Sequence, residues 1–238
     1  MSKEMLQGER ELSFLAGLAR ASNRRTFLQW SGLTLGVVAL GCSNNNSDVG
    51  TGPGGGTGVD LGTGDTGILN YAYALEQLEA AFYTEVLSKP YFSGAPAGEQ
   101  AILTDIRNHE VIHRDFLKAA LGAGAIPTLT VDFTSVDFAD RASVLGAART
   151  FEDLGVAAYN GAGKLLTDPA NLLTAGKIVS VEARHASAIR DLLEPNSFAN
   201  ADVVDPRGLD LAQSPTDVLK AVDPFLVTTI TSAGLPTT

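Results

Sequence analysis

The sequence predicts an all-α protein built on a four-helix bundle, with a long connection between the second and third helices and a short helix near the C-terminus. From residue 68 onward, apolar residues recur at spacings of three and four, which places them on one face of a helix. Proline and glycine divide this region into separate helices, and no alternating pattern is long enough to build a sheet.

Helix-starting and helix-ending residues set the expected bounds. The first helix ends before Lys89-Pro90, and the second ends near Gly122. The fourth begins with Asp168, a capping residue, followed by Pro169 in the first turn, where the missing N–H has no partner to lose. The long helices are expected at about residues 67–88, 97–122, 139–166 and 168–194, and the short one at 215–222.

The chain divides into four parts by composition. These are an export-like segment at residues 1–42, a glycine-rich flexible linker at 43–66, the four-helix bundle at 67–194, and a C-terminal extension at 195–238 that packs on the bundle. The 238 residues carry a formal net charge of −10, without a basic tract or a patch of interleaved basic and aromatic residues. This composition disfavours a nucleic-acid partner.

The N-terminal segment resembles a twin-arginine export signal. Its weakly apolar run, residues 27–40, is too short to span a bilayer. The residues that match the export pattern are Arg24, Arg25, Phe27 and Leu28, whereas their flanking residues depart from it. Residues 39–42, ALGC, resemble a lipobox with Leu and Ala exchanged, and Cys42 is the single cysteine. The resemblance implies an exported protein, either periplasmic or anchored by a lipid on Cys42 at the extracytoplasmic face of the membrane. An ordinary buried or membrane-touching helix is the alternative.

Two helices carry the same polar pair within an otherwise apolar face. Glu110 and His113 interrupt the apolar stripe of the second helix, and Glu182 and His185 interrupt that of the fourth. The chain has three histidines, and these two each follow a glutamate by three residues. The third, His109, lies one residue off the stripe and is interpreted as a surface residue or as the partner of a ligand. The repeated pair indicates a site.

The first and third helices carry another repeated pair, a glutamate followed seven residues later by a tyrosine. The two pairs are Glu76 with Tyr83 and Glu152 with Tyr159. Glu79 is the alternative to Glu76, but its counterpart in the third helix is Gly155, so the repeat favours Glu76. Residues 68–121 and 139–194 therefore read as two copies of one helical hairpin.

The spacing within each hairpin places these polar residues at one level. The midpoint between Glu76 and Glu110 is residue 93, and that between Glu152 and Glu182 is residue 167, both inside expected turns. Residues 123–138 join the hairpins and reach about 50 Å when fully extended. Such a connection can run back along the bundle, which makes the second and third helices parallel and brings all the polar residues together.

Four carboxylates and two imidazoles at one level of an apolar bundle need a counter-charge. An unpaired buried carboxylate costs on the order of several kcal/mol. Two divalent cations would balance the four carboxylates and leave the histidines as neutral ligands. A buried hydrogen-bonded network without metal is the alternative.

Residues 68–194 resemble the ferritin-like superfamily, whose dinuclear sites take one glutamate from each of two helices and Glu-x-x-His from each of the other two. The resemblance implies two iron or manganese ions as cofactors. By this resemblance, Glu76 and Glu152 would be terminal ligands, and Glu110 and Glu182 would be bridging ligands. The nitrogen ligands would be His113 and His185. Tyr83 and Tyr159 would lie beside the site as hydrogen-bond or electron-transfer partners, with plain core tyrosines as the alternative. The phrases LEQLEAAFY and GVAAYNGA look closest to exported bacterial ferritin-like proteins related to desiccation-associated proteins.

This resemblance implies oxidoreduction with dioxygen or peroxide, as in ferroxidase, peroxidase or catalase reactions. The implied partners are metal ions, a small oxidant and the membrane, and a homo-oligomer is left open. A second hypothesis is a non-catalytic metal-binding or structural envelope protein, stabilised by its metals and linked to stress or desiccation tolerance. A third is a metal-free acidic helical scaffold. An iron-storage cage is disfavoured, because every subunit would have to accommodate the tether and the lipid.

Overall fold

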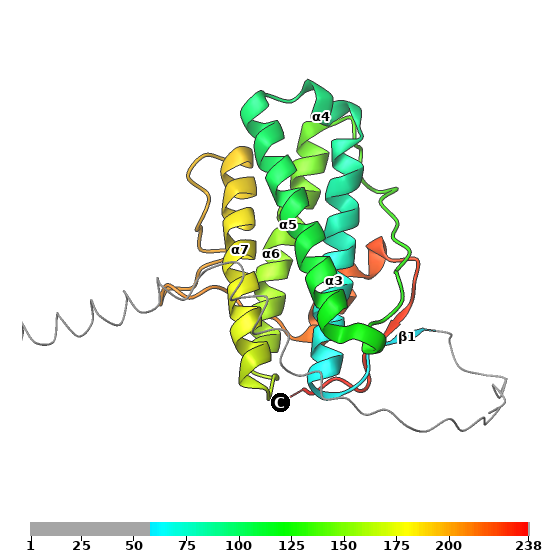
Figure 1. Ribbon diagram of the computed structural model, residues 1–238. Helices are drawn as coiled ribbons and strands as arrows, with labels where there is room; N and C mark the ends of the chain where they lie inside the picture. The colour runs from blue at the N-terminus through cyan, green and yellow to red at the C-terminus, as the bar shows by residue number, and fades with distance from the viewer. Residues whose placement is uncertain (1–57, 238) are drawn as a thin grey trace, which may run out of the picture. The chain divides into compact units, whose positions relative to one another are not determined.

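Four long helices form the main body of the part of the chain that the structure describes. The computed structural model describes residues 58–237, and Figure 1 shows α3 beside α5 and α6 beside α7. Their bounds are Gly64–Leu87 for α3, Ala97–Leu121 for α5, Arg141–Gly163 for α6 and Pro169–Leu193 for α7. The predicted all-α fold is confirmed. The export-like segment, Cys42 and residues 43–57 of the expected linker lie outside the described residues.

Side-chain caps and a glycine define the helix ends. The Asp140 carboxylate accepts a hydrogen bond from the Ser143 backbone N–H at the start of α6, and Asp168 does the same for Ala170 at the start of α7. The second helix ends where Gly122 adopts a φ of 55°, a left-handed conformation that glycine tolerates. The expected bounds therefore agree with the observed ones within a few residues.

Shorter helical elements connect and cover the bundle. They are α4 (Pro90–Gly94), the 3-10 turn η1 (Gly122–Gly124), α8 (Pro215–Val222) and the 3-10 turn η2 (Asp223–Phe225). The bounds of α8 are those expected from its Ser214-Pro215 start, since Ser214 Oγ accepts a hydrogen bond from the Asp217 N–H at 3.2 Å. The sequence did not indicate α4, which lies in the expected turn and is held by a 2.5 Å bond from the Tyr91 hydroxyl to Glu99.

A two-stranded parallel ladder joins the two ends of the described region. Strand β1 (Val59–Asp60) lies in the expected linker and pairs with β2 (Ile230–Thr231), which lies in the expected C-terminal extension. Leu61 is fully buried, and Asn70 Nδ2 donates to its carbonyl oxygen at 3.1 Å. Because the C-terminal strand and this buried leucine anchor them, residues 58–63 pack on the bundle rather than behaving as a free tether.

The connection between α5 and α6 runs back along α3, as its length predicted. Two buried amides on α3 hold it: Asn70 Oδ1 accepts from the Ile126 N–H at 3.0 Å, and Gln77 Oε1 accepts from the Leu129 N–H at 2.9 Å. At the far end, the Tyr91 N–H donates to the Phe138 carbonyl beside α4. The third long helix therefore starts at the same end of the bundle as α5, so the two helices run parallel.

Within residues 58–237, no helix combines the length and the apolar character needed to cross a bilayer.

Residues 195–213 form a segment that crosses the outer face of α6 and α7. Arg190 of α7, which is 4% exposed, binds Asp153 of α6 at 2.7 Å and Asp202 of the segment at 2.9 Å. Farther along, the Gln213 N–H donates to the Ala157 carbonyl oxygen at 2.9 Å. A Cβ added at Gly161 would lie 1.7 Å from the Gln213 carbonyl oxygen, so the crossing requires glycine there.

Replacing Gly161 with alanine is expected to lower the free energy of unfolding by roughly 1–3 kcal/mol, because the backbone at Gln213 must move away from α6. Gly146→Ala is the matched control in the same helix, since a Cβ there would meet no atom within 4 Å among the described residues beyond the backbone of its own helix. That change is expected to stabilise the helix by roughly 1 kcal/mol. Chemical denaturation of both variants measures the difference. Equal effects of the two substitutions would contradict the close crossing.

Candidate metal centre

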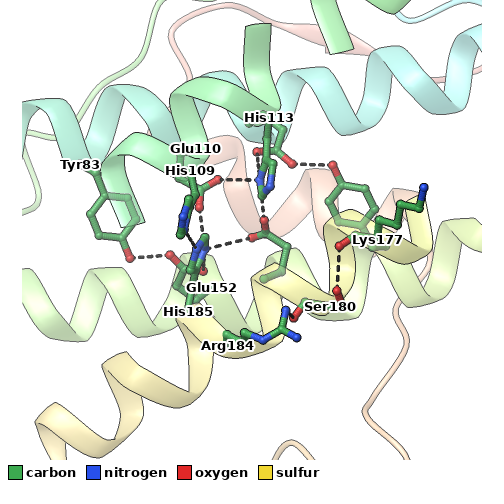
Figure 2. A network of polar contacts seen from close by, with 12 residues as sticks. Tyr83, His109, Glu110, His113, Glu152, Lys177, Ser180, Arg184 and His185 are labelled. Carbon is green, nitrogen blue, oxygen red and sulfur yellow. Dashed lines mark hydrogen bonds and ion pairs between the residues drawn. The ribbon is translucent and has the colours of Figure 1, made fainter. Parts of the chain in front are cut away.

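The six ligands expected from the sequence converge in the middle of the bundle. Glu76 comes from α3, Glu110 and His113 from α5, Glu152 from α6, and Glu182 and His185 from α7. All four glutamates are fully buried, and Figure 2 shows the two imidazoles pointing toward carboxylates in the space between the helices. The positions of the turns had predicted this common level.

These residues form two overlapping groups, each able to hold a metal ion. The first is Glu76, Glu110, His113 and Glu182, and the second is Glu110, Glu152, Glu182 and His185. In each group, one possible ligand atom per residue lies within 4.8 Å of the others. Because Glu110 and Glu182 belong to both groups, they occupy the shared position that two adjacent ions would need.

The contacts follow the approximate twofold repeat of the two hairpins. His113 Nδ1 lies 2.9 Å from Glu182 Oε1 and 3.5 Å from Glu76 Oε2. His185 Nδ1 lies 2.7 Å from Glu110 Oε1 and 3.5 Å from Glu152 Oε2. Each histidine is therefore closest to the shared glutamate of the other hairpin, and the site ties the two hairpins together.

The atoms that face one another here lack hydrogen-bond partners within the described part of the chain, despite these short distances. They are Glu76 Oε2, both oxygens of Glu110 and of Glu182, Glu152 Oε2, His113 Nδ1 and His185 Nδ1. Buried polar atoms are almost always paired, and leaving one unpaired costs about 1–3 kcal/mol. A cluster of unpaired oxygen and nitrogen atoms aimed at a common centre fits a metal site, and these donor types suit iron or manganese.

Two buried tyrosines satisfy the remaining oxygens. The Tyr83 hydroxyl of α3 donates to Glu152 Oε1 at 2.6 Å, and the Tyr159 hydroxyl of α6 donates to Glu76 Oε1 at 2.5 Å. Each tyrosine thus holds a glutamate of the opposite hairpin and leaves its second oxygen free to face the centre. The structure places both side chains where the resemblance located them, beside the site.

The carboxylates of the cluster differ in pKa because their surroundings differ. Burial raises the pKa of Glu76 to about 8 and raises that of Glu182 well above its ordinary range. Burial also opposes ionisation of Glu110, but its contacts with His113 and His185 outweigh this and lower its pKa to about 2. Glu110 is therefore the carboxylate most strongly held in its charged form.

The same carboxylates raise the pKa values of the two histidines. Burial alone would lower the pKa of His113, but contacts with Glu110 and Glu182 raise it to about 12. For His185, burial is likewise outweighed by Glu110 and Glu152, and the pKa rises to about 10. Without metal, each imidazole therefore takes up a proton and supplies the positive charge that the carboxylates need.

Glu79, the alternative to Glu76, lies next to the centre but in neither group. It is 3% exposed, and burial followed by repulsion from Glu182 raises its pKa well above the ordinary range. A Cβ at Gly155 would meet Glu79 Oε1 at 3.0 Å and Glu182 Oε2 at 3.4 Å. Gly155 therefore makes room for the Glu79 carboxylate beside the site.

His109 contacts the proposed ligand His185. The sequence left two roles open for it, a surface residue or the partner of a ligand. The residue is exposed to solvent, and its Nδ1 lies at hydrogen-bond distance, 2.9 Å, from His185 Nε2. The two rings are stacked with centroids 5.1 Å apart and planes 10° from parallel (Figure 2). If His185 Nδ1 held a metal, its Nε2 would carry the proton and donate to His109, which would fix the tautomer and the ring orientation.

Replacing His109 with alanine is expected to weaken metal binding roughly 10–100-fold, because His185 loses the partner that orients it. Competition titration of the metal-free full chain with Mn²⁺ and a chelator measures this affinity. Asn108→Ala, which removes the neighbouring exposed side chain, is the matched control and should leave the affinity unchanged. Equal affinity in His109→Ala and the wild type would show that the stacked pair has no role in binding.

A family model described as the ferritin-like domain matches residues 64–195, more than half of the chain. The chain belongs to the ferritin-like domain family. The matched residues run from the start of α3 to just beyond α7 and include every member of both groups. Outside the match, this ferritin-like domain is extended by β1 on one side and by the crossing segment, α8 and β2 on the other. No curated protein matches the chain.

Proposed function

We propose that this ferritin-like protein binds two iron or manganese ions and acts as an oxidoreductase on dioxygen or hydrogen peroxide outside the cytoplasm. The observation that carries the proposal is the set of unpaired buried atoms in two groups sharing Glu110 and Glu182. Glu76 and Glu152 would each bind one ion, and the shared glutamates would bind both. His113 and His185 would each provide one Nδ1.

The chain's own residues prepare this site in three ways. Four carboxylates balance two divalent ions, so the histidines can stay neutral. The hydroxyls of Tyr83 and Tyr159 hold one oxygen of each terminal glutamate, which orients the other toward the centre. Full burial of the four glutamates excludes bulk water, which strengthens their electrostatic interactions with bound ions.

Two bound iron or manganese ions would supply two electrons, one from each ion, to the O–O bond of the oxidant. With two protons from solvent, these electrons convert one dioxygen into one hydrogen peroxide. With one hydrogen peroxide and two protons, they give two water molecules. Both reactions balance, and the buried site limits side reactions with solvent.

Elemental analysis and rapid mixing of the full chain test this proposal. Metal-free protein is loaded with Fe²⁺ or Mn²⁺ without oxygen, and the expected stoichiometry is two ions per chain. Mixing with dioxygen or hydrogen peroxide should then change the absorption spectrum and consume the oxidant repeatedly when a reductant is present. Two bound ions without any reaction would remove the oxidoreductase assignment and leave metal binding.

A non-catalytic envelope protein is the second candidate. The same unpaired carboxylates support it, because ions that neutralise them would stabilise the fold whether or not they react. A large rise in melting temperature with Mn²⁺, combined with no consumption of oxidant, would favour this function. Stress or drying tolerance is the role we infer for it from the resemblance to desiccation-associated proteins.

The location we propose rests on sequence alone. Arg24-Arg25 would direct export, and a lipid on Cys42 would attach the mature protein at the extracytoplasmic face of the membrane. The mass of the N-terminal peptide from protein isolated from membranes tests this. An acylated cysteine at the N-terminus is the expected result, and an intact residue 1 would contradict both export processing and lipidation.

A further inference from the structure

An apolar cavity lies inside the bundle, one helical turn from the candidate metal centre. It has a volume of about 20 Å³ and is lined from all four long helices. Three wall residues each lie four positions from a proposed ligand: Ala72 precedes Glu76, Leu117 follows His113, and Ile178 precedes Glu182. A separation of four residues on a helix corresponds to about 6 Å along its axis. The cavity therefore lies next to the proposed metal ligands, on the side of the bundle that contains the α6–α7 turn.

Several wall residues away from the metal centre are half-buried, although Ile68 there is 3% exposed. Beside the ligands, Leu117 and Ile178 are buried, whereas Leu69, Leu166 and Ala175 at the outer end are half-buried. The half-buried residues place the outer end of the cavity near the surface at the α6–α7 turn. The cavity can thus serve as an access route for a molecule small enough to pass between these side chains.

Two tyrosines give the apolar cavity its polar features. Tyr159 is part of the wall, and its hydroxyl already donates to Glu76 Oε1, so its ring separates the cavity from a proposed ligand. Tyr71 is 1% exposed and also lines the cavity, and its hydroxyl has no hydrogen-bond partner among the described residues. A buried hydroxyl without a partner is costly, and a guest molecule with an oxygen atom could accept its hydrogen bond.

The repeat of the two hairpins does not extend to this cavity. Near Tyr83, the counterpart of Tyr159, aromatic rings fill the interior: Phe82 and Tyr83 have centroids 5.2 Å apart, and Phe82 and Phe151 5.0 Å apart. Small side chains, Ala158 and Ala162, stand beside Tyr159 instead. The larger space, about 20 Å³, therefore lies beside Tyr159, whereas the cavity beside Phe151 measures about 10 Å³.

We propose that this cavity binds the small neutral oxidant on its way to the metal centre. The inference rests on the proposed function, since it names the site that binds the oxidant before it reaches the metal centre. Apolar cavities stay dry and accept small apolar guests, and a volume of about 20 Å³ restricts the guest to a molecule as small as dioxygen. Anions and hydrated metal ions do not fit, because the lining offers them no compensating charge.

Xenon under pressure tests the cavity independently of any metal. In the metal-free full chain, xenon is expected to shift the methyl NMR signals of Ala72, Leu117 and Ile178. Ala162→Leu fills the space and should abolish these shifts, whereas Ala120→Leu, an exposed site on α5, should keep them. Absence of xenon-induced shifts in the wild type would overturn the proposal, whether or not any variant folds.

Reaction rates then connect the cavity to the oxidant. Ala162→Leu is expected to bind Mn²⁺ or Fe²⁺ with unchanged affinity but to react with the oxidant roughly tenfold more slowly. Tyr71→Phe should slow the reaction with hydrogen peroxide and spare that with dioxygen if peroxide uses the hydroxyl, which distinguishes the two oxidants. Wild-type rates in Ala162→Leu would overturn the route. Failure of wild-type protein to bind metal or to react would instead overturn the proposed function and leave the xenon result standing.

Discussion

Replacing Glu182 with glutamine is expected to raise the melting temperature of the metal-free protein and to abolish its response to iron or manganese. Burial raises the pKa of Glu182 well above its ordinary range, so the folded metal-free protein holds a proton there more tightly than the unfolded chain does. Glutamine resembles the protonated acid and needs no proton. It cannot, however, supply the negatively charged oxygen that both metal groups share.

The loss of the metal response should be large. An ion that binds only the folded state stabilises it by about 2.7 kcal/mol at a hundredfold excess over Kd. Wild-type protein should show this gain for each ion bound, and Glu182→Gln should show almost none. Thermal denaturation with Mn²⁺ or with a chelator measures both states.

Glu79→Gln is the matched control for this experiment. Glu79 is equally buried, its pKa is raised by burial and by Glu182, and it lies in neither metal group. The substitution should therefore stabilise the metal-free protein while keeping the full metal response. A lost response in Glu79→Gln would add Glu79 to the ligands, and a retained response in Glu182→Gln would refute the shared position.

The six candidate ligands were predictable because they obey local rules. Spacings of three, four and seven place residues on one face of a helix regardless of what surrounds it. Short turns then fix the level at which the two members of a hairpin meet, so Glu76 lies at the level of Glu110, and Glu152 at that of Glu182. The long connection was predictable from its length, although the amides of Asn70 and Gln77 that hold it were not.

Contacts between hairpins could not be predicted in the same way. The His109–His185 pair depends on how closely α5 and α7 approach, which the packing of the whole bundle determines. The tyrosines were expected beside the site, but their exchange of partners, Tyr83 with Glu152 and Tyr159 with Glu76, is a property of the assembled bundle. Two-residue strands such as β1 are too short for any periodicity to indicate them.

The stability of the metal-free protein is expected to fall between about pH 5 and about pH 8, whereas that of the metal-loaded protein rises over the same range. The folded-state pKa of Glu76 is raised from 4.5 to about 8, so its unfavourable contribution is absent below 4.5 and grows as the pH rises through that interval. The pKa of His185 is raised from 6.5 to about 10, so its favourable contribution is complete below 6.5 and is lost above it. Both groups act in the same direction.

Glu110 affects stability outside the range from pH 5 to pH 8. Its pKa is lowered from 4.5 to about 2, so its stabilising contribution is present above 4.5 and is lost only as the pH falls toward 2. Each proton held more tightly by the folded state changes the free energy of unfolding by about 1.4 kcal/mol per pH unit. The metal-free protein should therefore be most stable at mildly acidic pH.

Bound metal reverses the dependence because the ions compete with protons for the same atoms. His113 Nδ1, His185 Nδ1 and the carboxylate oxygens must be deprotonated to bind, so raising the pH strengthens metal binding and with it the folded state. Melting temperatures measured across this range, with Mn²⁺ and with a chelator, should give curves of opposite slope. In Glu182→Gln the two curves should coincide. A metal-free wild-type protein that gains stability from pH 5 to pH 8 would contradict the placement of protons between these carboxylates and imidazoles.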